Sequence, residues 1–437
     1  MSFPQAPTSY LLSIGEELLE GRVRDTNAGT FATELLLRGF HVVGMRTLGD
    51  APGELTTVLQ ELAGKVDFIL STGGLGPTVD DRVRAEAAAF AKVPLKVIST
   101  EAETSLAQLY QRVSKVQEPP SFFMAQARMP QGATALANRA GSAWGFLLPL
   151  AAGGFYAALP GPPRECGATF HQGGLIEFLE EQFGGDDGSL AYGLLNTVGA
   201  PESVVESKMR DLLEKGGNPR LGITAGADKV CLSILARAEG GQSAKEVRDA
   251  CLGELRQRLG DVVFGEGHQS LAEVVVDQLK RKNQRLAVAE SCTGGQLAAA
   301  VTSVPGASAV FHGGFLTYAN EAKVQSLGVP LSLLEAHGAV SAEVAAAMAV
   351  GARERCGCDW ALSTTGVAGP GGGTEDKPVG LVWIGLAGPD GQVHTFRRRQ
   401  YARGGRAVVQ QLSVRDALDA LRRAIGGLTP LASTPVN

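Results

Sequence analysis

The sequence is poor in the residues that mark secreted and metal-rich proteins. It has 6 cysteines and 6 histidines among 437 residues. The cysteines lack the spacing of metal ligands, because Cys356 and Cys358 form a C-x-C pair with no second pair. Scattered cysteines of this kind are typical of reduced thiols, so we expect a cytoplasmic protein. Residues 1–8 have no basic start followed by an apolar core, and we expect no signal peptide.

Long apolar runs and an excess of basic charge are also lacking. The most apolar stretch, residues 143–160, is interrupted by Pro149, Gly153 and Gly154, and it predicts two strands and a turn rather than a membrane span. The net charge of −5 gives no electrostatic footprint for nucleic acid and no polybasic membrane anchor. Glycine is abundant, with 57 residues, which favours tight turns and backbone-lined sites. We expect small-molecule partners, and neither a membrane nor a nucleic acid.

A chain of this length is too long for one hydrophobic core, and its patterns predict three domains of mixed α/β class. Residues 1–182 alternate strands with helices, which is typical of a parallel sheet. Residues 186–268 give the order strand, helix, strand, strand, helix, strand, a small α+β unit. RNA-binding KH modules have a similar order, but no Gly-x-x-Gly loop or basic face is evident here, so we favour a spacer or a dimer contact. Residues 269–426 predict a further α/β domain.

A glycine-rich stretch follows the buried strand predicted at residues 66–71. Its chemistry-bearing residues are Gly73, Gly74, Gly76, Thr78, Asp80 and Asp81. Glycines at the carboxyl end of a strand let backbone amides approach a phosphate closely. Two adjacent carboxylates suit a divalent cation such as Mg²⁺ bridging phosphate oxygens, or a general base. A glycine turn with solvated acids is the alternative, but the combination favours a binding site.

A second stretch places reactive side chains at a turn between a strand and a helix. Residues 286–288 predict a short apolar strand and residues 296–301 a helix. Between them lie Ser291, Cys292, Thr293, Gly294 and Gly295. Serine and threonine are the ordinary helix caps, so capping alone would explain them. A turn of this type also exposes a nucleophile beside free backbone amides.

Groups that could assist such a nucleophile lie further along the chain. A serine needs a base to take its proton, and no histidine lies near these motifs. Lys323 is the better candidate if burial or nearby charge lowers its pKa, and Tyr318 could relay the proton or orient a substrate. An exposed lysine and a core tyrosine are the alternatives. The glycine-rich loop 366–373 can offer amides to an oxyanion or a phosphate, and Arg406 could pair with a phosphate.

The N-terminal motifs resemble those of a known family. They are Gly15-Glu16-Glu17, Asp25-Thr26-Asn27, Gly49-Asp50, residues 73–81, residues 138–146 and Leu159-Pro160-Gly161. They are similar to the molybdopterin-binding fold of the MoaB and MogA proteins, and more closely to the N-terminal domain of the CinA family. The resemblance implies metal-dependent hydrolysis of ADP-ribose, with Asn27 and Asp50 at the site and Asp80 and Asp81 at a divalent metal. Arg82-Val83-Arg84 departs from the Leu-Thr that usually follows Asp81, so lost or altered pyrophosphatase activity is an open alternative.

The C-terminal motifs resemble the second half of the same family. They are residues 289–295, 314–323, 365–373 and 377–380. The corresponding domain is the nicotinamide mononucleotide deamidase of pyridine nucleotide recycling, and it implies no cofactor. By resemblance, Ser291 is the nucleophile, Lys323 and Tyr318 handle the proton, and Thr365 and Gly366 contact the oxyanion or amide. The residues expected to bind substrate are Thr293, Gly294, Gly295, Asn320, Gly366, Gly371, Gly372, Thr374 and Arg406.

The sequence therefore predicts a homodimeric, three-part enzyme that converts nicotinamide mononucleotide to nicotinate mononucleotide and ammonia. Its N-terminal domain would bind a nucleotide diphosphate such as ADP-ribose, with cleavage of the diphosphate as a further expectation. One alternative is an ADP-ribose pyrophosphatase with an accessory C-terminal domain. Another is a non-enzymatic partner in competence or DNA damage. Cys292 is the stronger nucleophile in principle, but the resemblance places the nucleophile at Ser291.

Overall fold

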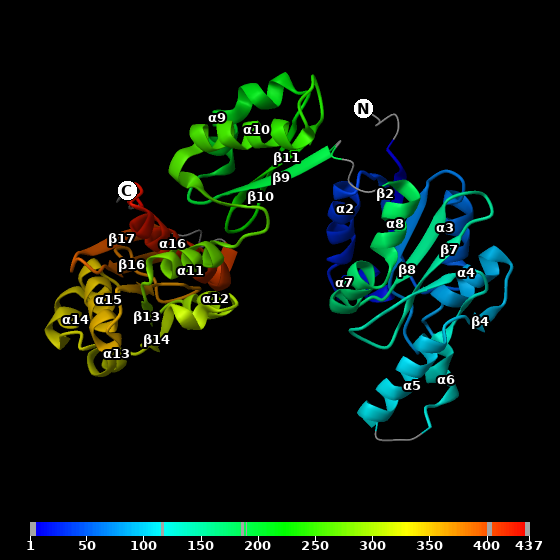
Figure 1. The fold of residues 1–437 in the computed structure, drawn as a ribbon. Helices are drawn as coiled ribbons and strands as arrows, with labels where there is room; N and C mark the ends of the chain where they lie inside the picture. The colour runs from blue at the N-terminus through cyan, green and yellow to red at the C-terminus, as the bar shows by residue number, and fades with distance from the viewer. Residues whose placement is uncertain (1–5, 115–117, 185–187, 189, 400–403, 433–437) are drawn as a thin grey trace. The chain divides into compact units, whose positions relative to one another are not determined.

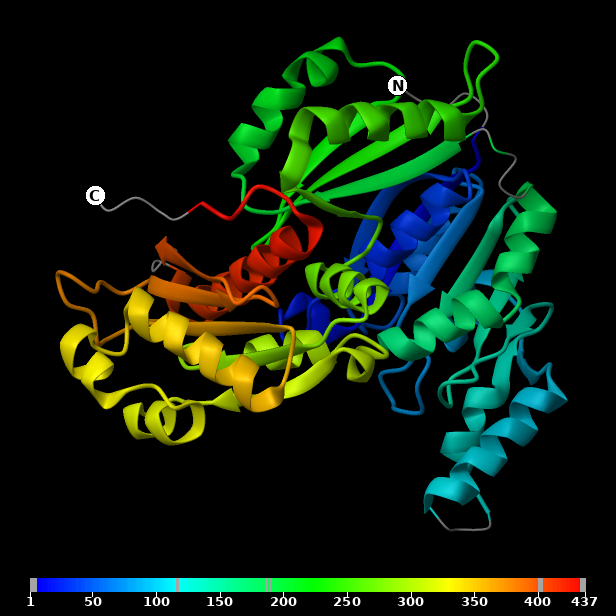
Figure 2. The same ribbon diagram turned by 60° about the vertical axis from the view of Figure 1, so that its left-hand side comes forward.

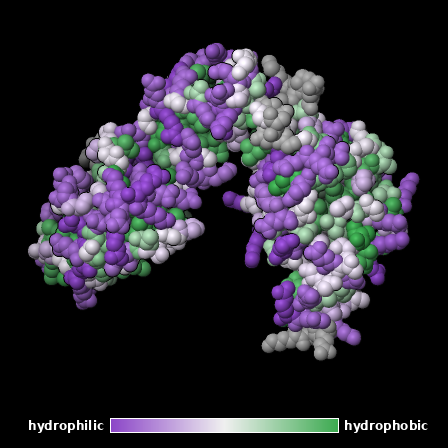
Figure 3. Space-filling model, in the orientation of Figure 1, coloured by the Kyte–Doolittle hydropathy of each residue, from purple (hydrophilic) through white to green (hydrophobic). Residues whose placement is uncertain are grey.

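The computed structural model describes residues 6–114, 118–184, 188, 190–399 and 404–432. These residues form two compact units, Met1–Leu190 and Ala191–Asn437, drawn as ribbons in Figures 1 and 2. Within the described ranges, no helix is long and apolar enough to cross a membrane. Figure 3 shows hydrophilic residues spread over the visible surface, with hydrophobic ones scattered among them.

The first unit is built on a six-stranded sheet in the order β2-β1-β3-β8-β7-β6. Its parallel strands are β1 (Thr8–Ile14), β2 (His41–Leu48), β3 (Phe68–Thr72) and β8 (Phe155–Leu159). Two antiparallel strands complete it, β6 (Thr134–Leu136) and β7 (Gly145–Pro149). Residues 143–160 thus form two strands and a turn, as predicted. Every residue of β3 is buried, as expected for a parallel strand covered on both faces.

Helices supply a separate core on each face of this sheet. One core includes α3 (Glu54–Leu62) and α4 (Val83–Ala91), and the other includes α2 (Asn27–Leu37), α7 (Pro163–Gln172) and α8 (Leu175–Phe183). The short α1 (Glu16–Leu19) follows β1. The remaining elements are β4 (Leu95–Val97), α5 (Thr100–Ser114), α6 (Ser121–Met124), η1 (Ala125–Ala127) and β5 (Arg128–Pro130). The sequence patterns did not single out this last segment, in which β4 and β5 make their own two-stranded sheet.

The second unit begins with the small α+β part, whose element order is the predicted one. Its elements are β9 (Leu190–Thr197), α9 (Glu202–Lys215), β10 (Arg220–Ala225), β11 (Val230–Arg237), α10 (Ala244–Leu259), η2 (Gly260–Val262) and β12 (Val263–Glu266). The sheet order is β10-β11-β9-β12. Met209 of α9 and Leu255 of α10 pack with Leu232 of the sheet in one core. We call this part the middle sheet.

The rest of the second unit is a five-stranded sheet in the order β14-β13-β15-β16-β17. The strands are β13 (Leu286–Glu290), β14 (Phe311–Leu316), β15 (Trp360–Gly366), β16 (Leu381–Ala387) and β17 (Val393–Arg399). On one face, Val288 shares a core with α11 (Leu271–Lys282), α12 (Gln296–Thr302), η3 (Ala307–Ala309) and α16 (Gly405–Gly426). On the other, Ala287 and Ala289 share a core with α13 (Asn320–Leu327), α14 (Leu331–His337) and α15 (Ala342–Cys356).

Buried charges near the end of α16 attach the middle sheet to this C-terminal domain. Asp419, which is 1% exposed, pairs with Arg422 and Arg423. Arg422 also donates to the backbone carbonyls of Asp261 at 2.7 Å and Val263 at 3.1 Å. Because a buried charge is costly unless it is paired and hydrogen-bonded, this network fixes the start of β12 against α16.

Candidate active site

The predicted nucleophile lies at the carboxyl end of the central strand β13. This strand runs parallel to β14 on one side and β15 on the other, and it ends at Glu290. Ser291 follows, with its amide donating to the carbonyl of Thr364 at 3.0 Å. Gly294 and Gly295 have φ values of 62° and 96°, a left-handed conformation that favours glycine, and they lead directly into α12. The sheet therefore holds Ser291 at a sharp turn from strand to helix.

Lys323 reaches Ser291 from α13. Its Nζ lies 3.2 Å from Ser291 Oγ, 2.9 Å from the carbonyl oxygen of Thr317 and 3.3 Å from that of Tyr318. The side chain is 1% exposed, and burial lowers the pKa of its amine. A neutral amine has two N–H donors and one lone pair. With both donors on the carbonyls, the lone pair is left for the proton of Ser291.

A buried carboxylate, Glu290, clamps the turn that carries Ser291. Its Oε2 accepts hydrogen bonds from the Thr293 hydroxyl at 2.7 Å and from the amides of Gly295 and Leu297 at 3.0 Å each. Its Oε1 accepts from the amide of Ala298 at 2.8 Å. Glu290 is 2% exposed, and the N-terminus of α12 stabilises its negative charge. The side chain just before the nucleophile thus ties the strand to the helix.

The hydrogen bonds of the turn decide which amides are left for a reacting oxygen. The Gly294 amide donates to the carbonyl of Ser291, and that of Gln296 to the carbonyl of Thr293. Since Glu290 takes the Gly295 amide, those of Cys292 and Thr293 remain, and neither has an acceptor among the described residues. An amide that directly follows a nucleophile is a usual donor to an oxyanion. The turn therefore provides its own candidate oxyanion site.

Tyr318 and Arg406 meet at the edge of this site. Arg406 Nη2 donates to the Tyr318 hydroxyl at 3.0 Å, and Nη1 donates to the carbonyl of Gly369 at 3.2 Å. Tyr318 is 61% exposed, and it contacts Lys323 through its backbone carbonyl rather than its hydroxyl. Both side chains are open to a ligand, because Arg406 is also exposed.

The other residues predicted for the C-terminal site are not hydrogen-bonded to the Ser291–Lys323 pair in the structure as described. The Thr365 hydroxyl donates to the carbonyl of Ala339 at 2.7 Å, so its proton is already committed. Thr374 Oγ1 accepts from the amide of Lys377 within the glycine-rich loop. Gly371 and Gly372 are exposed in the same loop, Gly366 is half-buried, and Asn320 is the exposed first residue of α13. None of these six has a hydrogen bond to Ser291 or Lys323 in the described part of the chain.

The neighbouring thiol is poorly placed to compete with Ser291. Cys292 is 4% exposed, and burial raises its pKa to about 12. Its carbonyl accepts a hydrogen bond at 2.9 Å from Gln410 of α16. A buried thiol with a raised pKa forms little thiolate, which is the reactive species. The geometry therefore favours the hydroxyl over the thiol.

In the first unit, the predicted glycine loop lies at the carboxyl ends of the parallel strands. A side chain at Gly73 would meet the carbonyl oxygen of Ile14, and Gly73 has a φ of 104°, so glycine is required. Asn27 donates to the carbonyl of Gly161 at 2.8 Å, which joins two motifs 134 residues apart. The Asp50 carboxylate accepts from the Glu16 amide at 2.9 Å. Five separate sequence motifs thus converge on one edge of the sheet.

The carboxylates and the arginine of this loop have distinct roles. Asp81 Oδ2 accepts from the amide and the hydroxyl of Thr78 and so closes the loop on itself, whereas Asp80 is exposed. Arg84 is 6% exposed and donates to the carbonyls of Leu75 at 2.7 Å and Gly76 at 2.9 Å. Burial lowers its pKa to about 10. Arg84, which is part of the departure from the family pattern, therefore stabilises the loop through hydrogen bonds to its backbone carbonyls.

Known proteins resemble this chain over nearly its whole length. A CinA-like protein of Desulfovibrio desulfuricans is 39% identical over 418 residues, which is 96% of this chain and 96% of the relative. One from Parasynechococcus marenigrum is 40% identical over 418 residues, or 95% of this chain and 97% of the relative. The chain belongs to the CinA family. The predicted family is thereby confirmed.

Three family models divide the chain among them. Residues 10–179 match the probable molybdopterin binding domain, residues 194–265 the damage-inducible protein CinA KH domain, and residues 268–425 the CinA C-terminal domain. A crystal structure of the competence/damage inducible protein CihA from Agrobacterium tumefaciens is 41% identical, covers 36% of this chain and 93% of its own, and has a TM-score of 0.35. The three family models confirm the predicted fold class, an N-terminal domain like MoaB and MogA, a small KH-type part and a C-terminal α/β domain.

The structure adds residues that sequence reasoning missed in this CinA chain. Glu290 and Gln410 both hold the turn formed by residues 291–295, which we call the nucleophile turn. Glu290 lies in the motif 289–295 but was given no role there, and Gln410 lies outside every motif. A signal existed for Glu290, because a carboxylate inside an apolar strand just before a helix N-terminus calls for a local partner. No local signal existed for Gln410, which lies 118 residues from its partner. In the first unit, Arg84 appeared only as a departure from the family pattern.

The predicted metal site has a limited set of donors. Within the described ranges, no group of three or more His, Cys, Asp or Glu side chains is arranged to hold a metal ion. Mg²⁺ often uses only one or two carboxylates together with phosphate oxygens of a substrate. Asp80 and the second oxygen of Asp81 fit such a partial set. The metal stays a prediction.

We predict that Glu290→Gln lowers kcat about 10- to 100-fold, because the amide would turn an N–H group toward at least one of the four donors and shift Ser291. KM should change little, since Glu290 does not face the substrate. The measurement is the steady-state rate of ammonia release from nicotinamide mononucleotide, the activity that the sequence predicts, with a melting temperature for each protein. Glu246→Gln is the matched control, because Glu246 also caps a helix but lies on α10. Equal losses of stability with unchanged kcat would assign Glu290 a structural role only.

Proposed function

We propose that the C-terminal domain hydrolyses the carboxamide of nicotinamide mononucleotide to nicotinate mononucleotide and ammonia. The observation that carries the proposal is the buried Nζ of Lys323, 3.2 Å from Ser291 Oγ. A serine beside a desolvated lysine is a nucleophile paired with its base. The choice of substrate rests on the family resemblance of residues 289–295, 314–323 and 365–373.

The proposed reaction passes through an acyl-enzyme. Lys323 takes the proton of Ser291, and Oγ attacks the carboxamide carbon. The amides of Cys292 and Thr293 stabilise the oxyanion. Lys323 then gives its proton to the departing nitrogen, and ammonia leaves as the C–N bond breaks. Water attacks the ester with Lys323 again as base, and nicotinate mononucleotide is released as Ser291 recovers its proton.

Tyr318 and Arg406 are suited to the non-reacting parts of this substrate. The nicotinamide ring of the mononucleotide is a cationic pyridinium, and the exposed face of a tyrosine attracts such a ring. The exposed guanidinium of Arg406 can pair with the 5′-phosphate. Because Arg406 already donates to the Tyr318 hydroxyl, the two side chains are held as one recognition pair.

Replacing the two candidate nucleophiles separately tests the assignment. Ser291→Ala should reduce ammonia release from nicotinamide mononucleotide by at least about 10³-fold, because no other group can form the acyl bond. Cys292→Ala should keep the rate within about tenfold, because the buried thiol only fills space. The measurement is an enzyme-coupled ammonia assay on folded protein. Activity lost only in Cys292→Ala would contradict the mechanism.

The pH dependence should report the protonation of Lys323. The base must be neutral, so kcat/KM should rise with pH through the pKa of Lys323, and burial places that midpoint below the ordinary value of 10.5. The Glu321 carboxylate raises this pKa. Glu321→Gln should therefore move the rising limb to lower pH without lowering the plateau. A limb that stays in place in Glu321→Gln, or that survives in Lys323→Met, would show that another group titrates.

We propose further that the N-terminal domain binds ADP-ribose and hydrolyses its diphosphate. The supporting observation is the glycine loop between β3 and α4, where Gly73 tolerates no side chain. A divalent ion bound by Asp80 and Asp81 would supply a positive charge for the phosphates. Arg84 holds the loop in shape by its bonds to two loop carbonyls. The homodimer expected from the sequence stays a prediction.

Asp81→Asn should weaken binding of ADP-ribose in the presence of Mg²⁺ and abolish release of AMP, because the loop loses its charge and one acceptor for Thr78. Calorimetric binding and AMP release are measured on the full chain. Glu177→Gln is the control, since Glu177 is an exposed carboxylate on α8. Binding that survives in Asp81→Asn as well as in the control would place the ligand elsewhere.

A further inference from the structure

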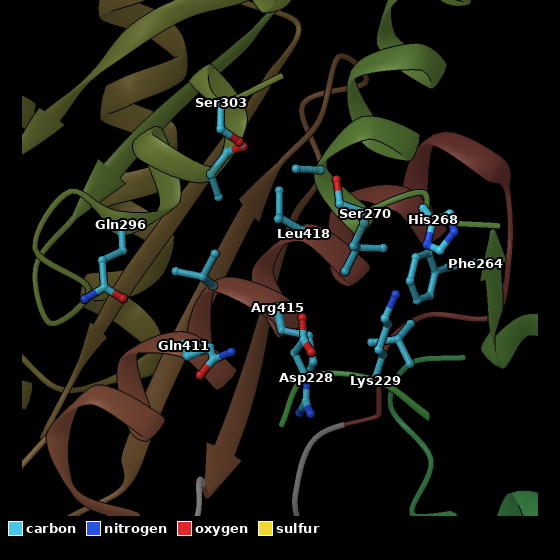
Figure 4. Close-up of a pocket in the computed structure, with 15 residues that line it drawn as sticks. Asp228, Lys229, Phe264, His268, Ser270, Gln296, Ser303, Gln411, Arg415 and Leu418 are labelled. Carbon is cyan, nitrogen blue, oxygen red and sulfur yellow. The ribbon is translucent and has the colours of Figure 1, made fainter. Parts of the chain in front are cut away.

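A cavity of ≈ 310 Å³ lies within the second unit, apart from Ser291 and Lys323. Figure 4 shows it between the middle sheet and the helices of the C-terminal domain. Its size and its mixture of apolar and polar walls match those of sites for small molecules, which often form where two domains meet. The residues that line it do not include Ser291, Lys323, Tyr318 or Arg406.

The cavity touches both helices that hold the nucleophile turn. From α12 it is lined by Gln296 and Ala300, which share one face of the helix, and Gln296 directly follows the turn. From α16 it is lined by Gln411 and Leu418. The neighbouring Gln410 holds the carbonyl of Cys292 and accepts from Gln296 at 3.1 Å. A molecule in the cavity would therefore contact the elements that position Ser291.

One side of the cavity is suited to a heterocyclic base. Figure 4 shows Gln296, Ser303 and Gln411 on the same side of the view. Carboxamide and hydroxyl groups can donate to and accept from the edge of a base. Val414 and Leu418 provide an apolar wall beside them. This side offers apolar contacts from aliphatic side chains and hydrogen bonds from uncharged amide and hydroxyl groups.

The other side is suited to a phosphate and a sugar. Lys229 and His268 gather there, together with Phe264 (Figure 4). The Lys229 ammonium pairs with no acid among the described residues, whereas Arg415 is already paired with Asp416 at 2.7 Å. Lys229 is thus the cation available to an anion. Asp228 lines the space between the two sides, and a carboxylate in that place can accept from ribose hydroxyls.

We propose that this cavity binds a mononucleotide, with its base between α12 and α16 and its phosphate at Lys229. The ligand would act on the amidase through the two helices. AMP is a suitable probe, because it has a base, a ribose and one phosphate but no carboxamide to hydrolyse. Its binding is measured by calorimetry without any catalytic step, so the outcome is independent of whether the chain deamidates nicotinamide mononucleotide.

A pair of adjacent alanines gives the matched test on the full chain. Ala300 lines the cavity, and Ala299 is exposed on the same helix and does not. Ala300→Phe should fill the cavity and weaken AMP binding there at least about tenfold, whereas Ala299→Phe should bind as the wild type does. In the ammonia assay, saturating AMP should change the rate of the wild type and of Ala299→Phe, but not of Ala300→Phe.

Lys229→Ala keeps the proposal testable if the phenylalanine variant does not fold. Wild type should bind AMP more tightly than adenosine, and Lys229→Ala should remove that preference while it leaves adenosine binding unchanged. AMP that binds equally well to Ala300→Phe and Ala299→Phe lies elsewhere on the chain and overturns the proposal. So does a preference for AMP over adenosine that persists in Lys229→Ala, or a wild type that binds no AMP.

Discussion

The burial of one amine is the constraint on which the C-terminal site depends. A lysine that is 1% exposed pays for lost hydration unless it is neutral or well paired, and Lys323 finds only uncharged oxygens around its Nζ. Two are backbone carbonyls of the chain that leaves β14, and the third belongs to Ser291. The same desolvation that costs folding free energy lowers the pKa of the amine and so makes its neutral, basic form easier to reach. Stability and reactivity are thus opposed at this residue.

A second buried charge holds the geometry that the first one needs. Glu290 lies on the same strand end, and its four donors all belong to the turn and the start of α12. By occupying the helix N-terminus, it removes the place where an anion would otherwise bind. The amides of Cys292 and Thr293 are then the ones left for an oxyanion. One carboxylate therefore fixes where Ser291 lies and which backbone donors can act on the substrate.

Local sequence patterns predicted most helices and strands well. They predicted less well which residues from distant parts of the chain contact one another. The small α+β unit has the predicted order of elements. Its helices Glu202–Lys215 and Ala244–Leu259 begin and end at ordinary signals, because Pro201 and Gly216 frame one and Ser243 and Gly260 the other. The segment from β4 to β5 was missed, since its strands are three residues long and its sheet has only two strands. The closeness of Ser291 and Lys323 came from resemblance, because no spacing rule joins a residue that follows strand β13 to one on helix α13. The hydrogen bond from the Gln410 side chain to the carbonyl of Cys292 depends on tertiary packing, so no local sequence pattern predicts it.

Helix α16 contacts both the middle sheet and the residues around Ser291. Its 22 residues span about 33 Å. Arg406 in its first turn holds Tyr318, and Gln410 in the next holds the nucleophile turn. Near the other end, the Asp419 network binds the carbonyls of the middle sheet at Asp261 and Val263. One rigid helix therefore carries, near one end, the contacts that hold Tyr318 and the nucleophile turn and, near the other, the contacts that anchor the middle sheet.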